Sequence, residues 1–182
     1  LLVLPELFAA GYQFADKEEV GRMAAPVPDG PTSKHLMALA KVKDTVFVAG
    51  LVEQDGDSIY NSAVVVGPKG YLGKYRKTHI PQVDPGFYEK FFFKPGDSGW
   101  PGFDTAYLKL GVYICYDRHF PEGWRALALN GAEYIVNPSA TVAGLSKYLW
   151  ELEQPAAAAA NGVFIGAINR VGSEEPWATT MN

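Results

Sequence analysis

The sequence lacks several features that mark large protein classes. It has one cysteine in 182 residues, which excludes an internal disulfide framework and suits a reducing compartment. No apolar run approaches the roughly 20 residues that a membrane span needs. The 16 basic and 20 acidic residues give a net charge of −4, so the basic excess typical of nucleic-acid binding is missing. We therefore expect a cytoplasmic protein without a nucleic-acid or membrane partner.

The sequence also lacks the usual patterns of metal-binding and phosphate-binding sites. The three histidines, His35, His79 and His119, are scattered, and no two of them stand one helical turn apart. No glycine-rich GxGxxG loop precedes a predicted helix. We therefore expect neither a metal ion nor an organic cofactor.

Length and composition predict one globular domain over residues 1–182. Hydrophobic residues make up 48% of the chain and charged residues 20%, which is ordinary for a folded domain. The chain opens directly on apolar residues 1–4 and stops shortly after the strand-like residues 163–169. We interpret it as part of a longer domain.

Alternating strand and helix signals predict an α/β fold. The predicted strands cover residues 1–4, 46–52, 58–66, 71–77, 103–107, 109–116, 134–136 and 163–169. The predicted helices cover residues 32–42, 121–130 and 148–161. Thr32 or Ser33 is expected to cap the first helix, and Pro155 to start a new helix or kink the last one. Residues 78–99 form a long connection rich in proline, glycine and aromatics, which is often a functional feature.

Three residues of different chemical type follow predicted strands. Ligands of open α/β sheets bind beyond the carboxyl ends of the strands, and Glu6, Lys77 and Cys115 all stand at such ends. A thiol attacks as the thiolate, so Glu6 is the candidate base and Lys77 the candidate positive charge that holds an oxyanion. The backbone N–H of Tyr116 is a second candidate oxyanion donor because a helix begins shortly afterwards.

The same residues have ordinary structural interpretations. Cys115 suits a small buried side chain in an apolar strand, and Glu6 suits a carboxylate in an early helical turn. Lys77 belongs to a run of basic residues that suits a solvated surface. A rival catalytic interpretation pairs Cys115 with His79 or His119, by analogy with papain-like hydrolases.

Three segments resemble the three motifs of the nitrilase, or carbon–nitrogen hydrolase, superfamily. They are LLVLPELFAAGY (residues 1–12), GKYRKTHIP (73–81) and GVYICYDRHFPE (111–122), in the family's order and with compatible spacing. The similarity extends over essentially the whole chain. The resemblance implies a four-layer αββα sandwich, truncated here at both ends, that assembles as a homodimer or a larger homo-oligomer.

The resemblance also implies roles for individual residues. It makes Glu6 the general base, Lys77 the oxyanion stabiliser and proton donor, and Cys115 the nucleophile. The family often has a second glutamate after the lysine motif, and Glu89 is the matching position here. The alternative for Glu89 is a surface carboxylate paired with one of the two lysines that follow it.

Within the superfamily, further segments point to carbamoyl substrates. Residues 115–121, 137–150 and 167–172 resemble β-ureidopropionase and related N-carbamoyl amino acid amidohydrolases. Residues 79–97 also resemble N-carbamoylputrescine amidases. The two groups differ because carbamoylputrescine is a cation, whereas carbamoyl amino acids carry a carboxylate.

The two residues after Asp117 bear on this choice. The putrescine enzymes typically show Gln-Trp where this chain has Arg118-His119, and an arginine fork fits a carboxylate. We therefore expect Arg118, His119 and Tyr116 to bind an anionic substrate such as N-carbamoyl-β-alanine. Otherwise, Arg118 forms a structural ion pair with Asp117 or Glu122, and His119 caps the helix that follows.

The resemblance thus implies an amidohydrolase with a small ureido acid or amide as its substrate. It would release ammonia, CO2 and an amino acid through a thiol-bound intermediate. Carbamoylputrescine or a simple aliphatic amide is the alternative substrate. A non-catalytic interaction scaffold is the alternative from another class of protein.

The predicted role of Lys77 leads to a first prediction. We expect Lys77→Ala to lower turnover by orders of magnitude with a modest effect on folding, because one oxyanion donor is worth a few kcal/mol in the transition state. Steady-state ammonia release measures the loss. Near-normal turnover in this variant would contradict the role.

Overall fold

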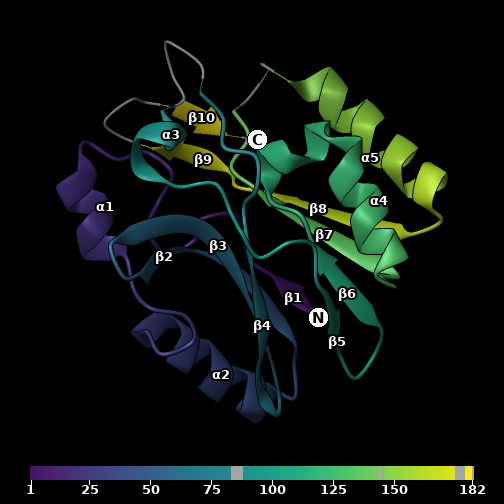
Figure 1. Cartoon of the computed structure of the whole chain (residues 1–182), viewed down its shortest axis with the longest axis horizontal. Coiled ribbons are helices and arrows are strands. Elements are labelled where there is room, and N and C mark those ends of the chain that lie inside the picture. Colours follow the sequence, from purple (N-terminus) through teal and green to yellow (C-terminus); the bar gives the residue numbers. More distant parts are fainter. Residues whose placement is uncertain (83–87, 143, 145, 175–178, 182) are drawn as a thin grey trace.

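The chain folds into four layers, with helices on the outside and two β-sheets between them (Figure 1). A computed structural model describes residues 1–82, 88–142, 144, 146–174 and 179–181. Within this described part, no helix is long and apolar enough to cross a membrane. The arrangement is the αββα sandwich predicted from the sequence.

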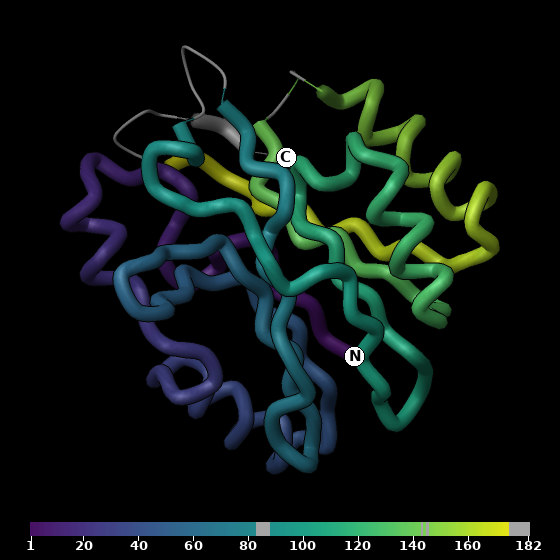
Figure 2. Tube along the Cα trace, viewed as in Figure 1, coloured from purple at the N-terminus to yellow at the C-terminus, as the bar shows by residue number. Residues whose placement is uncertain are grey.

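The first sheet has the strand order β1-β2-β3-β4. Strand β1 (Leu2–Val3) pairs parallel with β2 (Phe47–Asp55), which pairs antiparallel with β3 (Ser58–Gly67). Strand β4 (Gly70–Arg76) is antiparallel to β3, so the predicted hairpin is confirmed. The N-terminal strand lies near the middle of the molecule, with later segments on both sides of it (Figure 2).

The second sheet has the order β5-β6-β7-β8. Strand β5 (Gly102–Asp104) is antiparallel to β6 (Lys109–Val112). Strands β6, β7 (Tyr134–Ser139) and β8 (Phe164–Asn169) run parallel, as expected for strands joined by helices.

A separate antiparallel pair follows the second sheet. It consists of β9 (Gly172–Glu174) and β10 (Thr179–Met181). The sequence did not predict this pair.

Helices cover the outer face of each sheet. Helix α2 (Pro31–Lys43) lies over the first sheet, and α4 (Pro121–Leu129) and α5 (Lys147–Asn161) lie over the second (Figure 1). Two shorter helices, α1 (Lys17–Met23) and α3 (Glu89–Phe92), lie near the edge of the first sheet.

Apolar side chains fill the space between the two sheets. Val48 and Val65 from the first sheet belong to the same buried cluster as Val112 and Ile135 from the second. A second buried cluster joins the inner face of α2 to the outer face of the first sheet. Because the two sheets share one core, the loops at their ends are held at fixed positions relative to one another.

Several predicted elements differ from the observed ones. Helix α2 begins after Gly30, and Pro31 occupies its first position, so neither Thr32 nor Ser33 is the cap. A proline is favoured there because its missing N–H has no intrahelical acceptor. Helix α5 runs through Pro155 as one element, so no new helix starts there. The connection at residues 78–99 contains the short helix α3.

The strand predicted over residues 109–116 is shorter than expected. Strand β6 ends at Val112, and Cys115 begins a 3-10 helix (Cys115–His119). The change occurs because the Asp117 carboxylate accepts a hydrogen bond from the Ile114 amide at 3.1 Å, which folds the chain back on itself. The strand predicted over residues 103–107 also ends early, where Thr105 bonds to Leu108 in a turn.

Gly50 allows the segment that carries Glu6 to lie directly on the sheet. A Cβ added to Gly50 would stand 2.6 Å from the Leu7 amide nitrogen and 2.7 Å from the Glu6 Cα. The Phe8 amide donates to the Gly50 carbonyl at 2.9 Å. Only glycine permits such a close approach between two backbones.

We expect Gly50→Ala to lower the free energy of unfolding by about 1–3 kcal/mol or more, because backbone atoms cannot yield as a flexible side chain can. Urea denaturation measures the change. Gly21→Ala in helix α1 is the matched control, since an added Cβ there meets nothing within 4 Å. The control is expected to stabilise the chain by up to about 1 kcal/mol. Equal effects of the two substitutions would contradict the close approach.

Candidate active site

The predicted site residues follow strands whose carboxyl ends meet at one edge of the molecule. Glu6 follows β1, Lys77 follows β4 and Cys115 follows β6. Because β1, β2 and β4 run in the same direction, Glu6 and Lys77 emerge on the same side of the first sheet. Thr141 follows β7 and faces the same region.

A buried ammonium lies between two buried carboxylates. Lys77 Nζ donates to Glu6 Oε1 at 2.7 Å and to the two carboxylate oxygens of Glu89 at 2.8 and 2.9 Å. Lys77 and Glu6 are fully buried, and Glu89 is 4% exposed. Lys77 is therefore not part of a solvated surface, and Glu89 is not a surface carboxylate paired with a neighbouring lysine.

Neutral donors complete the coordination of the two carboxylates. Asn61 Nδ2 donates to Glu6 Oε1 at 2.7 Å and reaches Glu89 Oε2 at 3.3 Å. The Ala140 amide donates to Glu6 Oε2 at 3.0 Å, and the Tyr12 hydroxyl donates to Glu89. Both Glu6 oxygens are thus engaged, which fixes the orientation of the carboxylate.

The cluster shifts the pKa values of its members. Burial opposes charge on Lys77, but the charges of Glu6 and Glu89 outweigh it and hold the pKa of the ammonium above its ordinary value. Burial and the Glu6 charge raise the pKa of Glu89, although Lys77 counteracts them. The ammonium therefore stays charged at any physiological pH.

Cys115 occupies a strained backbone position at the base of a small cavity. Its φ is +45°, a left-handed conformation that is uncommon for residues other than glycine. The side chain is 6% exposed. Its Sγ lies 3.7 Å from Thr141 Oγ1 and 3.9 Å from Arg118 Nη1.

Burial raises the pKa of the Cys115 thiol to about 11. The charge of Glu6 contributes to this rise, whereas the charges of Lys77 and Arg118 oppose it. The thiol is therefore protonated at neutral pH. A nucleophilic role requires that a neighbouring base accept its proton during attack.

Asp117 holds the turn that presents Cys115. Its carboxylate accepts from the Ile114 amide at 3.1 Å and from the Tyr75 hydroxyl at 2.8 Å. It also contacts His79, whose backbone amide and Nδ1 both lie 2.8 Å from Oδ1. These bonds tie β4, the loop after it and the Cys115 turn together.

The histidines are engaged elsewhere. His79 contacts Asp117 and stacks on Phe120 with ring centroids 3.7 Å apart, and His119 Nδ1 lies 2.7 Å from Glu153 Oε1. In the described part of the chain, neither imidazole is within hydrogen-bond range of the sulfur. The Cys–His alternative is therefore not supported. His119 also does not cap α4, because that helix has no side-chain cap.

The predicted substrate-binding residues line one cavity with the thiol. This cavity, of about 110 Å³, is bordered by Cys115, Tyr116, Arg118, His119, Thr141 and Ser146, among others. Tyr116 is the second residue of the 3-10 helix, where backbone N–H groups lack intrahelical acceptors.

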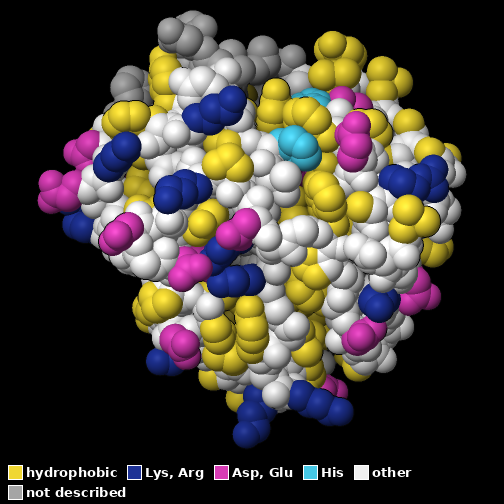
Figure 3. Space-filling model, in the orientation of Figure 1, with side chains coloured by type: hydrophobic (Ala, Val, Ile, Leu, Met, Phe, Trp, Pro, Cys, Tyr) yellow, Lys and Arg dark blue, Asp and Glu magenta, His cyan; other side chains and the backbone are white. Residues whose placement is uncertain are grey.

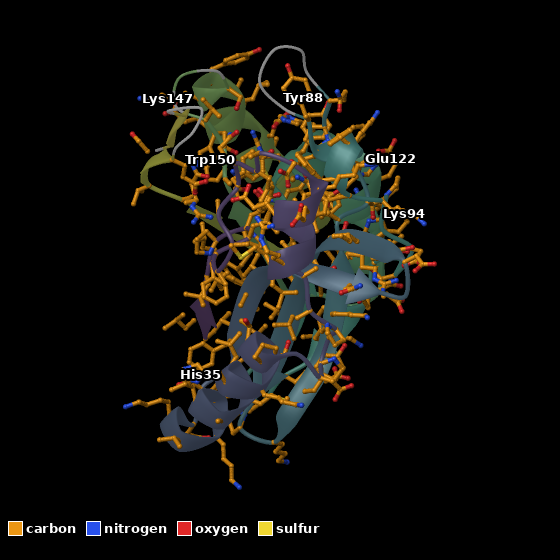
Figure 4. All side chains as sticks on the ribbon, turned by 90° about the vertical axis from the view of Figure 1, so that its left-hand side faces the viewer. His35, Tyr88, Lys94, Glu122, Lys147 and Trp150 are labelled. Carbon is orange, nitrogen blue, oxygen red and sulfur yellow. The ribbon has the colours of Figure 1, made fainter. Side chains whose placement is uncertain are left out.

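Two hydroxyl groups and a carboxylate hold the Arg118 guanidinium. Nη1 donates to Thr141 Oγ1 at 3.2 Å, and Nη2 donates to Ser146 Oγ at 3.1 Å. Nε lies 3.7 Å from Glu153 Oε2, so the structural ion pair that was the alternative role of Arg118 is formed with Glu153 rather than with Asp117 or Glu122. The guanidinium carbon is 5.3 Å from the centre of the Trp150 ring. Trp150 and Tyr88 lie at one end of the molecule, and His35 at the other (Figure 4).

Four residues that the sequence did not single out contact the predicted ones. Tyr12 and Asp117 lie inside the recognised motifs, so their position in the sequence was a usable signal. Asn61 lies in the middle of β3 and Thr141 follows β7, and both reach the site only through the tertiary fold.

The exposed charged side chains of the described residues are spread over the surface and form no metal-binding cluster. Among those residues, no three His, Cys, Asp or Glu side chains gather in a way that could hold a metal ion. On the face drawn in Figure 3, basic and acidic side chains are interspersed.

A family model described as carbon–nitrogen hydrolase matches residues 1–181. The chain belongs to the carbon–nitrogen hydrolase family. The match runs through all three segments that suggested this family from the sequence.

Curated relatives of this carbon–nitrogen hydrolase family member are considerably longer. The chain is 47% identical over 175 residues to a nitrilase from Pyrococcus abyssi, covering 96% of the chain and 63% of the relative. It is 43% identical over 178 residues to a β-ureidopropionase from Arabidopsis thaliana (96% and 43%). It is 41% identical over 183 residues to an N-carbamoylputrescine amidase from Solanum lycopersicum (96% and 60%). The chain therefore spans between 43% and 63% of the length of these relatives.

A solved structure supports the fold of the family member directly. The crystal structure of a carbon–nitrogen hydrolase from Helicobacter pylori superimposes with a TM-score of 0.80 at 35% identity. The match covers 99% of this chain and 67% of the other.

The burial of Lys77 changes the expected effect of Lys77→Ala on stability. Its removal would leave Glu6 and Glu89 buried together without their shared counter-ion, and breaking a buried ion pair costs about 3–5 kcal/mol. Lys77→Ala is therefore expected to lower stability as well as turnover. A folded-state check by thermal unfolding must accompany the activity measurement.

A third prediction separates the charge of Glu6 from its proposed function as a base. We expect Glu6→Gln to lower the pKa of Cys115 below about 11, because the negative charge that disfavours the thiolate is removed. The same variant should lose turnover, because no base takes the thiol proton. The pH dependence of iodoacetamide labelling, read by mass spectrometry, measures the pKa. The control is Glu18→Gln on the exposed surface of α1; a midpoint that stays in place or rises in Glu6→Gln would contradict the prediction.

Proposed function

We propose that this chain is the catalytic part of an amidohydrolase that cleaves the terminal C–N bond of an N-carbamoyl amino acid. The observation that carries the proposal is the cavity that contains both the Cys115 thiol and the Arg118 guanidinium, 3.9 Å apart. A nucleophile for the ureido carbon and a cation for a carboxylate thus face the same small space. The relatives named β-ureidopropionase and N-carbamoylputrescine amidase support the carbamoyl class.

In the first half of the proposed reaction, the thiol adds to the ureido carbon. Glu6 takes the thiol proton as the S–C bond forms. This transfer is needed because the high pKa keeps the free thiol protonated. Lys77 and the Tyr116 amide stabilise the negative charge that develops on the ureido oxygen. Glu6 then passes this proton to the terminal nitrogen, and the C–N bond breaks to release ammonia. A thiocarbamate remains on Cys115, and Glu6 is again a carboxylate.

In the second half, water replaces the sulfur. Glu6 takes a proton from the water as it attacks the thiocarbamate carbon. The S–C bond then breaks, and Glu6 returns the proton to the sulfur, which restores the thiol. The released carbamate loses CO2 and yields the free amino acid. Glu89 keeps Lys77 fixed and charged throughout, because it binds the ammonium through both oxygens.

Arg118 favours an anionic substrate over a cationic one. Its guanidinium is 4% exposed and is held in place by Thr141 and Ser146, so little rotamer freedom is lost when a ligand binds. A fixed cation beside the thiol attracts a carboxylate and repels an alkylammonium group. This distinguishes carbamoyl amino acids from carbamoylputrescine.

The test is ammonia release from N-carbamoyl-β-alanine, an N-carbamoyl-α-amino acid, N-carbamoylputrescine and a simple aliphatic amide. We expect the two acids to be hydrolysed and the cation to be a poor substrate. Activity on carbamoylputrescine alone would select the cationic alternative. No release from any substrate, together with an unreactive Cys115, would select the scaffold.

The Arg118→Gln variant tests whether Arg118 binds the substrate carboxylate. A hydrogen bond to a charged group is worth about 1.5–3 kcal/mol, so KM for a carbamoyl acid should rise about ten- to 150-fold. The KM for an uncharged aliphatic amide, measured in the same variant, should change much less, because that substrate has no carboxylate. Arg125→Gln on the exposed side of α4 is the control. Equal losses for both substrates would contradict carboxylate binding.

A further inference from the structure

A second cavity lies next to the one that contains the thiol. It measures about 430 Å³ and is lined mainly by aromatic side chains, including Phe14, Phe91 and Phe93. Glu89 borders this cavity, whereas Cys115 borders the smaller one. Among the described residues that line the two cavities, Tyr12 is the one that they share.

Tyr12 is held in place at both ends. Its backbone amide donates to Glu174 Oε2 at 2.7 Å, and its hydroxyl donates to Glu89. Its ring packs in a buried cluster with Leu7 and Phe93 and is 8% exposed. A ring fixed in this way forms a wall, because it cannot turn aside without breaking the bond to Glu89.

The two cavities that Tyr12 borders differ in volume. At about 110 Å³, the cavity of the thiol is the smaller of the two, and it shares Thr141 and Val142 with a further cavity of about 600 Å³. Pockets that bind drug-sized ligands measure about 300–1,000 Å³. The aromatic cavity lies in that range by itself, and Tyr12 borders both it and the cavity of the thiol.

We propose that Tyr12 determines substrate size by closing the thiol cavity against the aromatic cavity. With the ring in place, a substrate bound at the thiol cannot extend into the aromatic cavity. Without it, the two spaces join and admit a substrate with an apolar arm, such as a benzyl group. The proposal deepens the proposed function for the choice of substrate, but the wall itself can be tested without any turnover.

Two alkylating reagents of different size provide that test. The Cys115 thiolate displaces iodide from iodoacetamide or from N-benzyliodoacetamide, forming a thioether and releasing iodide. Cys115 is the one cysteine of the chain, so intact-mass spectrometry reports its labelling without ambiguity. The quantity of interest is the ratio of the two labelling rates, which cancels any change in the pKa of the thiol.

We expect Tyr12→Ala to raise the benzyl-to-parent ratio about tenfold, the lower end of what a pocket gains or loses with small changes in apolar volume. Tyr12→Phe keeps the ring and removes the hydroxyl, so its ratio should equal that of the unaltered chain. Phe91→Ala removes an aromatic ring from the far cavity and leaves the wall, so its ratio should also be unchanged.

An unchanged ratio in Tyr12→Ala would overturn the proposal, as would an equal rise in Phe91→Ala. If Tyr12→Ala does not fold, as judged by thermal unfolding, Tyr12→Leu is measured in its place, and the same two outcomes decide. Ammonia release from N-carbamoyl-β-alanine is measured in parallel. A raised labelling ratio without turnover on any substrate would refute the proposed function and leave the wall intact.

Discussion

The structure of the site depends on one buried ammonium that is shared by two buried carboxylates. Lys77 can remain charged in the interior because Glu6 and Glu89 surround it, and it bonds to both carboxylates in turn. This mutual dependence ties together three segments that are distant in the sequence. Asn61 extends the cluster by donating to both carboxylates, so the orientation of each group depends on the others.

A second buried ion cluster fixes the strand that carries Lys77. The neighbouring Arg76 points to the opposite face of β4, where its guanidinium donates to Glu53 at 2.6 and 3.0 Å and to Asp97 at 2.9 Å. The backbone of Lys77 is bound on both sides, its amide to Asn61 and its carbonyl to Gly96, each at 2.8 Å. Backbone hydrogen bonds therefore fix the position of Lys77 in addition to the contacts of its side chain with the two carboxylates.

A different set of constraints acts on the Cys115 thiol. Cys115 is buried and strained, its pKa is raised, and its turn is maintained by Asp117. Such a thiol is a weak nucleophile until a base takes its proton. Tyr12 links the cavity of the thiol to the ammonium cluster, because its hydroxyl binds Glu89 while its ring borders that cavity.

The sequence by itself determined an α/β fold, because strand and helix signals are local patterns. Its three motifs determined the family by resemblance, and the family in turn implied the two-sheet fold and the residues that carry the charges. It also contained a signal for helix α1, the Asp16 and Glu19 capping pair, that was not used. Only the tertiary structure decided that Lys77 is buried, that Arg118 pairs with Glu153, and that Asn61 completes the site. Those outcomes depend on which strands become neighbours, and no spacing along the chain encodes the distance between two side chains that meet across a shared core.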